Sequence, residues 1–162
     1  MPTSLRSTRK NNFTKSERLC SRKAIEALFA GGNRSFTAFP LRVVYRLVEE
    51  KVMLPPAEEG ASFSNESSDF VCQVLVSVSK RHFKHAVDRN RAKRQVREAW
   101  RLNKDILICA AEGPKPVART LHIAFLWLAD ELQESELIQR KMRNLLHRIA
   151  EEISARDLNN RS

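Results

Sequence analysis

Residues 80–104 hold the side chains whose types and spacing most clearly indicate a chemistry. Ten of these residues are Lys or Arg and only two are acidic, so the segment carries a net charge of +8 in a chain whose total is +10. Guanidinium groups donate paired hydrogen bonds that fit the oxygens of a phosphate group. The segment therefore predicts a binding site for the phosphate backbone of a nucleic acid.

The spacing within this segment predicts an amphipathic helix. Side chains at helical spacing form one largely apolar face: Ala92, Val96, Ala99, Trp100 and Asn103. Polar side chains with the same spacing fall on the opposite face: Asn90, Arg94, Arg97 and Arg101. We therefore expect Trp100 and Val96 to be buried in a core, while the Arg side chains project outward.

Two other interpretations of this helix remain open. A basic helix face can simply be solvated, although a charge of +8 in so short a segment favours a polyanionic partner. Arg and Asn on one face could also contact base edges in DNA. The sequence shows no helix-turn-helix companion and no dimerisation segment, so DNA is the weaker alternative.

The stretch 86–100 reads AVDRNRAKRQVREAW, and it closely resembles the signature AVxRNRxKRxxRE of the bacterial ribonuclease P protein subunit. The matching positions are Ala86, Val87, Arg89, Asn90, Arg91, Lys93, Arg94, Arg97 and Glu98. The preceding VSVSK, residues 76–80, is similar to the end of a strand in that family. With weaker similarity on both flanks, the resemblance covers residues 13–154.

The resemblance implies a division of labour. In bacterial ribonuclease P the RNA subunit removes the 5′ leader of precursor tRNA by metal-assisted hydrolysis, while the protein supplies charge neutralisation, shape and leader contacts. Mg²⁺ would be held by the RNA subunit, with none bound by the protein alone. The expected RNA-binding residues are Lys80, Arg81, Arg89, Asn90, Arg91, Lys93, Arg94, Arg97 and Arg101. Those from Arg89 to Arg97 would dock near the catalytic core of the RNA.

A first helix is expected within residues 14–32, with Ser21 as its N-cap and Gly31 near its end. Its apolar stripe includes Ile25 and Phe29, and core packing is the default interpretation of such a stripe. The resemblance implies instead that this helix borders a cleft for the single-stranded 5′ leader, where aromatic side chains stack on bases. Ile25, Phe29 and Tyr45 are the implied leader contacts, and a core role is equally open for Tyr45.

The sequence predicts no catalytic residue of the protein's own. It contains no nucleophile elbow, no HExxH motif, no Walker loop and no carboxylate cluster that could hold two metals. We therefore expect the protein to act as the non-catalytic component of a ribonucleoprotein endoribonuclease. A non-enzymatic RNA-binding protein, such as a ribosomal-protein-like assembly factor, is the alternative, and it would need no leader cleft.

Cysteine usage and hydropathy constrain the compartment. The three Cys are far apart and form no CxxC pair, which is typical of a reducing compartment. They also do not group with His at zinc-site spacing, so no protein-bound metal is expected. No apolar run approaches 18 residues, so we expect no membrane partner and a cytoplasmic location.

The remaining elements predict an α+β fold with a mixed sheet of three to four strands packed with three helices. Strands are expected at residues 39–48, 70–79 and 120–129, and the basic helix is expected to continue to Ala111. A long helix should begin at Ser135. The resemblance implies a left-handed crossover through the basic helix. Residues 13–154 should form one RNA-binding domain with a mobile loop at 49–69, a basic flexible tail at 1–12 and a frayed tail at 155–162.

Overall fold

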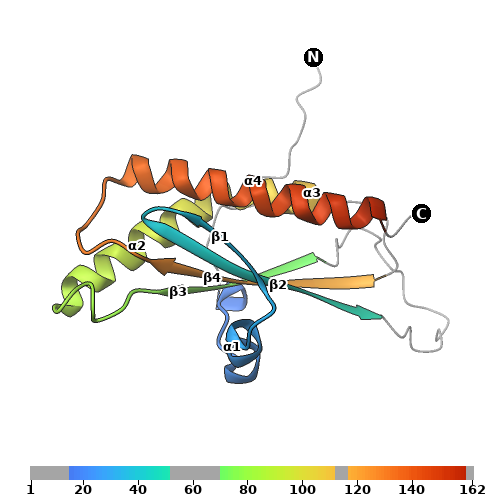
Figure 1. Cartoon of the computed structure of the whole chain (residues 1–162), viewed down its shortest axis with the longest axis horizontal. Coiled ribbons are helices and arrows are strands. Elements are labelled where there is room, and N and C mark those ends of the chain that lie inside the picture. The colour runs from blue at the N-terminus through green and yellow to red at the C-terminus, as the bar shows by residue number, and fades with distance from the viewer. Residues whose placement is uncertain (1–14, 52–69, 112–116, 160–162) are drawn as a thin grey trace, which may run out of the picture.

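The computed structural model describes residues 15–51, 70–111 and 117–159. It contains a four-stranded sheet whose strands are β1 (Arg34–Ala38), β2 (Leu41–Lys51), β3 (Phe70–Ser77) and β4 (Val117–Trp127). The strand order is β1-β2-β4-β3, with antiparallel pairs except for the parallel pair of β3 and β4. The mixed α+β fold expected from the sequence is confirmed (Figure 1).

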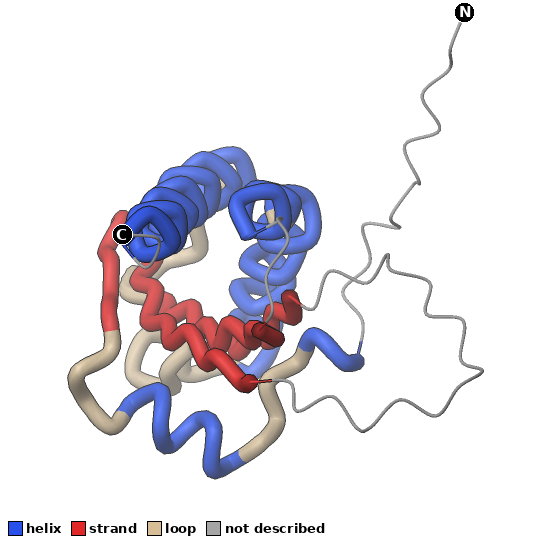
Figure 2. Tube along the Cα trace, turned by 90° about the vertical axis from the view of Figure 1, so that its right-hand side faces the viewer, coloured by secondary structure: helices blue, strands red, loops and turns tan. Residues whose placement is uncertain are grey.

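Helices cover both faces of this sheet unequally. The helices α2 (Ala86–Asn103), α3 (Asp105–Ala111) and α4 (Ser135–Asn159) lie on one side. The short helix α1 (Arg22–Phe29) lies on the other side, after a 3₁₀ turn, η1 (Lys15–Glu17). Figure 2 shows the sheet between these two layers. Side chains of β4 are therefore buried on both faces, as its doubly apolar sequence predicts.

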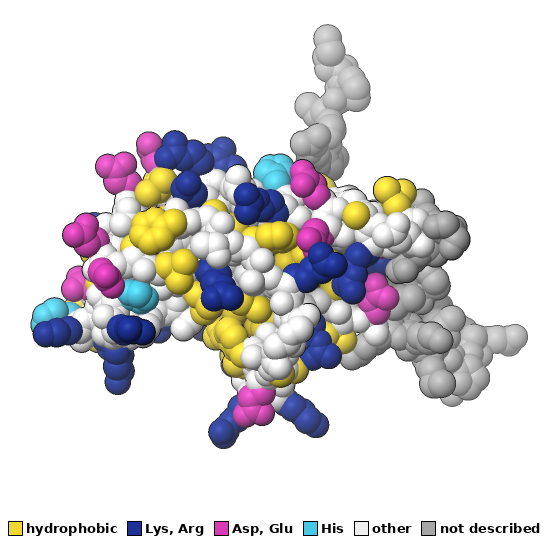
Figure 3. Space-filling view, viewed as in Figure 1, with side chains coloured by type: hydrophobic (Ala, Val, Ile, Leu, Met, Phe, Trp, Pro, Cys, Tyr) yellow, Lys and Arg dark blue, Asp and Glu magenta, His cyan; other side chains and the backbone are white. Residues whose placement is uncertain are grey.

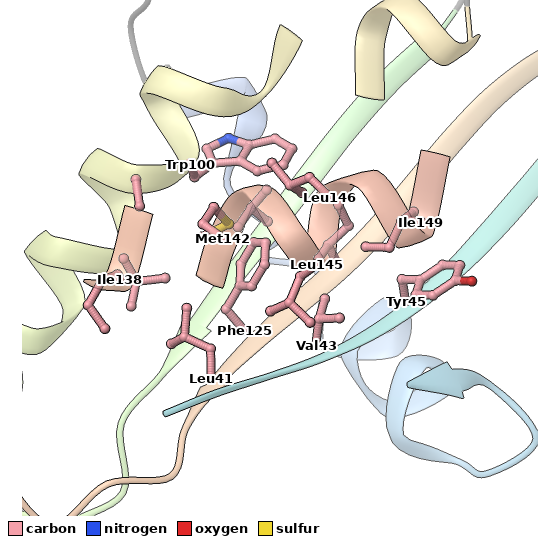
Figure 4. Packing of buried hydrophobic residues seen from close by; sticks show 14 of the residues in the cluster. Leu41, Val43, Tyr45, Trp100, Phe125, Ile138, Met142, Leu145, Leu146 and Ile149 are labelled. Carbon is pink, nitrogen blue, oxygen red and sulfur yellow. The ribbon is translucent and has the colours of Figure 1, made fainter. Parts of the chain in front are cut away.

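The larger core lies between the sheet and the three-helix layer. Alternate residues of β4, among them Ile123 and Phe125, point into it and meet the apolar stripe of α4. The ring of Trp100 from α2 lies 6.0 Å from that of Phe125, measured between centroids, and only 1% of Trp100 is exposed. Figure 4 shows these side chains converging from α2, α4 and the strands. A smaller core under α1 contains Leu28 and Ala124.

Several boundaries differ from those expected. The basic helix does not continue unbroken to Ala111, because the chain turns at Lys104 between α2 and α3. The Lys104 side chain is only 8% exposed, and its Nζ donates to Glu17 Oε1 at 2.8 Å. This ion pair ties the turn to η1, a contact between residues far apart in the sequence. The buried Lys104 ammonium is thus compensated by an opposite charge from another element.

The strands and the C-terminal tail show further differences. The edge strand β1 was not expected, because RSFTA is short and lacks a clear apolar alternation. Residues 49–51, expected in a loop, extend β2. The helix α4 continues to Asn159 instead of fraying from residue 155, since Asp157 pairs with Arg119 on β4. The expected tail at 1–12 and residues 52–69 of the expected loop lie outside the described residues.

Candidate nucleic-acid interface

The turn that leads from β3 into α2 is held by its own side chains. Arg89 Nη1 donates to the backbone oxygens of Phe83 and Lys84, at 2.9 and 3.0 Å. His82 Nδ1 lies 2.7 Å from Asp130 Oδ1, in the connection between β4 and α4. Because these contacts fix the first turn of α2, part of the predicted RNA-binding set also has a structural role.

The expected division of α2 into two faces is confirmed. Ala92, Val96, Ala99 and Trp100 are each at most 1% exposed. On the other side the exposed residues include Asn90, Arg91, Arg94 and Arg97. Lys93 and Arg101 are half-buried, and Asn103 uses its amide to donate to Ala99 O at 2.8 Å. The helix thus presents a row of guanidinium groups to solvent from a fixed core.

Charge along this row is only partly neutralised. Arg101 Nε donates to Glu98 Oε2 at 3.0 Å, and this hydrogen bond lowers the pKa of the Glu98 carboxyl below its usual value. None of the ion pairs among the described residues involves Arg91, Arg94 or Arg97. We call Arg91, Arg94 and Arg97 the open basic row. Like charges at helical spacing repel, so a polyanion bound here would stabilise them.

One cation beside this row was not found from the sequence. Arg18 lines the same shallow groove as Arg94, Arg97 and Arg101. It follows η1, where the backbone bridges to Val74 at the outer edge of β3. The sequence separation between Arg18 and α2 is so large that no local spacing could reveal this placement.

Lys80 and Arg81 lie at the end of the molecule where β3 leads into α2. Both are exposed, and the backbone N–H of Arg81 donates to Ser79 Oγ at 3.2 Å. Figure 3 shows Lys and Arg side chains projecting from this end, on the left of the view. The structure therefore places these two residues near the N-terminal half of α2 and its basic side chains.

The implied leader contacts are not all brought together. Ile25 is half-buried against the sheet, and Phe29 is 46% exposed at the end of α1. Ser21 caps this helix as expected, since its hydroxyl accepts from Ala24 N–H at 3.4 Å. Tyr45 lies on the opposite face of the sheet, in the core under α4. The structure thus groups Ile25 with Phe29 and separates both from Tyr45.

Tyr45 has a specific partner in that core. Its hydroxyl donates to Glu152 Oε2 at 2.6 Å, and its ring stacks on Phe36 with 5.9 Å between centroids. Burial, followed by the neighbouring Glu152 carboxylate, raises the pKa of the Tyr45 phenol far above its usual value. Tyr45 is therefore a neutral hydrogen-bond donor under all ordinary conditions.

The sheet face that carries α1 also presents polar side chains. Arg42 and Arg46 are exposed there, and Arg46 lies opposite His122 in the register of β2 and β4. Burial, and then the charge of Arg46, lowers the pKa of His122 below its usual value, so the imidazole is neutral at pH 7. His122 was assigned no role from the sequence, because an isolated His in a strand gives no signal.

Metal binding, membrane insertion and thiol chemistry are the remaining possibilities among the described residues. No group of three or more His, Cys, Asp and Glu residues is arranged there to hold a metal ion. Within the same ranges, no helix is long and apolar enough to cross a membrane. Cys20, Cys72 and Cys109 are free thiols, and burial raises the pKa of Cys72 to about 12.

Comparison with known proteins gives one consistent result. The ribonuclease P family model matches residues 13–150. The ribonuclease P protein component of Porphyromonas gingivalis is 40% identical over 148 residues, which cover 91% of this chain and 93% of that protein. That of Chlorobium phaeobacteroides is 31% identical over 143 residues, covering 86% and 88%.

A solved structure shares the fold. The Staphylococcus aureus RNase P protein at 2.0 Å matches with a TM-score of 0.51 and 19% identity, over 84% of this chain and 96% of that one. The relatives at 31–40% identity and this solved structure point to the same family. The open basic row and the sheet with helices on both faces fit that family. The chain belongs to the ribonuclease P protein family.

Proposed function

We propose that the open basic row binds the RNA subunit of ribonuclease P and thereby promotes removal of the 5′ leader from precursor tRNA. By its family, the protein is one component of an endoribonuclease ribonucleoprotein. The observation that carries the proposal is the exposure of Arg91, Arg94 and Arg97 without ion-pair partners among the described residues. Such groups break no ion pair with a described residue when phosphates approach, and they gain charge-assisted hydrogen bonds.

The protein's contribution to catalysis would be electrostatic. An RNA fold brings phosphates close together, and their repulsion must be screened by Mg²⁺ or by bound cations. A rigid helix that presents guanidinium groups provides part of this screening. The Mg²⁺ that takes part in hydrolysis would be held by the RNA subunit.

The leader would lie on the α1 side of the sheet. Phe29 is exposed there and can stack on a base, with Ile25 beside it and Arg46 supplying positive charge. Neutral His122 can exchange hydrogen bonds with a base edge or a sugar hydroxyl. Tyr45, in the core on the opposite face of the sheet, would support this surface by its packing. The three free thiols are compatible with action in the cytoplasm, where we place the protein.

Reconstitution tests this function. The protein alone should leave precursor tRNA uncut, whereas the protein added to a bacterial ribonuclease P RNA at low Mg²⁺ should restore 5′ cleavage. Arg94→Ala with Arg97→Ala should impair this rescue, and raised Mg²⁺ should recover much of the loss. Cleavage by the protein without RNA would contradict the proposal. RNA binding without any effect on cleavage would instead favour the assembly factor.

A further inference from the structure

Two connections meet at the end of the molecule where the basic segment begins. One is the turn that leads from β3 into α2, residues 78–85, and the other joins β4 to α4 at residues 128–134. Figure 1 shows both connections at the left end of the view. The turn carries three exposed cations, Lys80, Arg81 and Lys84. In Figure 3, basic and acidic side chains are mixed at this end of the molecule.

The first turn of α2 has little core beneath it. Val87 is 77% exposed, and the side chain of the N-cap residue His85 makes no capping hydrogen bond. The preceding turn has an apolar anchor in Phe83, whose ring lies 6.2 Å from that of Trp127, measured between centroids. The rest of the positioning must come from polar contacts, and Arg89 supplies one of them within the turn itself.

His82 joins this turn to the connection between β4 and α4. Its Nδ1 lies 2.7 Å from Asp130 Oδ1, and its side chain is only 20% exposed, whereas that of Asp130 is 82% exposed. An ionised carboxylate can only accept a hydrogen bond, so Nδ1 carries the hydrogen and donates it. Lys80 and Arg81 directly precede His82 in the chain. The contact therefore restricts the backbone from which these two cations project.

Asp130 can act as an anchor because the connection that carries it is held on both sides. Before it, the backbone N–H of Leu128 donates to Pro40 O at 2.8 Å. After it, Gln95 Nε2 of α2 donates to Gln133 O at 2.7 Å. The Asp130 carboxylate thus projects from a fixed backbone, even though solvent reaches most of its side chain.

We propose that Asp130 is a positioning residue for RNA binding, which accepts the hydrogen bond of His82 and so keeps Lys80 and Arg81 where they meet RNA phosphates. This role rests on the proposed function. It is the opposite of what charge alone predicts, because an acid close to bound phosphates repels them. Glu131, the next residue, is exposed and forms no ion pair among the described residues, so it can only repel. Two adjacent acids therefore act on RNA binding in opposite directions.

The test measures the affinity of the full chain for a bacterial ribonuclease P RNA at low salt. Three variants, Asp130→Ala, Asp130→Asn and Glu131→Ala, each remove one negative charge. Asp130→Ala should weaken binding about threefold, because a smaller fraction of molecules then holds the turn in the binding arrangement. Asp130→Asn keeps an amide oxygen that can accept from His82 Nδ1. Both Asp130→Asn and Glu131→Ala should therefore bind at least as tightly as the wild type.

Salt dependence separates lost phosphate contacts from a damaged fold. For Asp130→Ala, the slope of log K against log salt should become shallower by about 1, because Lys80 and Arg81 no longer both reach phosphates. Its thermal unfolding should stay close to that of the wild type, since an ion pair with a largely exposed partner adds little stability. His82→Ala should reproduce both results, and adding Asp130→Ala to it should cause no further loss of affinity.

Several outcomes would overturn this role of Asp130. They are binding by Asp130→Ala as tight as that of the wild type or tighter, an equal loss in Asp130→Asn or Glu131→Ala, and a loss in Asp130→Ala with an unchanged salt slope. Failure of the proposed function would look different, because the wild-type protein would then not stimulate cleavage of precursor tRNA by the RNA. A wild-type protein that stimulates cleavage, together with Asp130→Ala that binds equally well, refutes the positioning role alone.

Discussion

Two long helices, α2 and α4, lie on the same side of the sheet and use their charges in opposite ways. Between its ends α2 carries six Lys and Arg against Asp88 and Glu98, and its open basic row has no ion pair among the described residues. On α4, five Lys and Arg accompany four acids, and Glu152 and Asp157 bind Arg34 and Arg119 of the sheet. Two acids of α4 thus hold that helix to the sheet, whereas Arg91, Arg94 and Arg97 of α2 stay exposed without an ion pair among the described residues.

The contrast between α2 and α4 requires that the apolar face of α2 anchors this helix to the core. Trp100→Ala removes a fully buried ring that contacts Phe125, and it should lower the free energy of unfolding by about 3–5 kcal/mol. Arg97→Ala, on the opposite face of the same helix, should change it by less than about 0.5 kcal/mol. Urea unfolding of both variants measures the difference, and similar losses would show that the two faces are not separate.

Measuring the affinity for RNA provides a second test of the contrast between α2 and α4. Arg94→Ala/Arg97→Ala should weaken binding to ribonuclease P RNA about a hundredfold at low salt, because two charge-assisted contacts are lost. The slope of log K against log salt should become shallower by about 1.5 to 2. Arg140→Ala/Arg143→Ala on α4 removes the same charge and should have a much smaller effect. An equal effect would mean that overall charge, and not the row on α2, sets the affinity.

The smallest effect concerns two arginines within α2 itself. Arg89 holds the turn before the helix through two backbone oxygens, whereas Arg91 is exposed. Arg89→Ala should therefore cost about 1 kcal/mol of stability, and Arg91→Ala less than about 0.5 kcal/mol. Thermal unfolding of the two single variants distinguishes them. If Arg91→Ala proved the more destabilising change, the assignment of Arg89 to the turn would be wrong.

Local periodicity determined which parts of this fold were predictable. The two faces of α2 follow from spacing within one helix, so Trp100 and Arg97 could be placed from the sequence alone. The alternation of β2 also puts Tyr45 on the face opposite Arg42 and Arg46, which agrees with its burial under α4. Its implied leader role came from resemblance, and the structure separates it from Phe29.

Contacts between distant segments were not predictable in the same way. Arg18 beside α2 and Lys104 paired with Glu17 each join residues that no local pattern connects. Lys104 shows the consequence for charge: it counts toward the basic segment in the sequence, yet Glu17 neutralises it inside the fold. Only the three-dimensional arrangement separates cations that are paired within the fold from those that stay exposed without an ion pair among the described residues.

The strand order also constrains how the chain can fold during synthesis. The strand β4 lies between β2 and β3, and β3 has no other strand partner among the described residues. Ribosomes deliver α2 before β4, so the cationic helix emerges while the sheet that must support it is still incomplete. Non-local pairing of this kind slows folding and prolongs exposure of apolar surface. A nascent chain halted before Val117 should therefore remain sensitive to proteases. A chain extended past Trp127 contains β4 and can complete the four-stranded sheet.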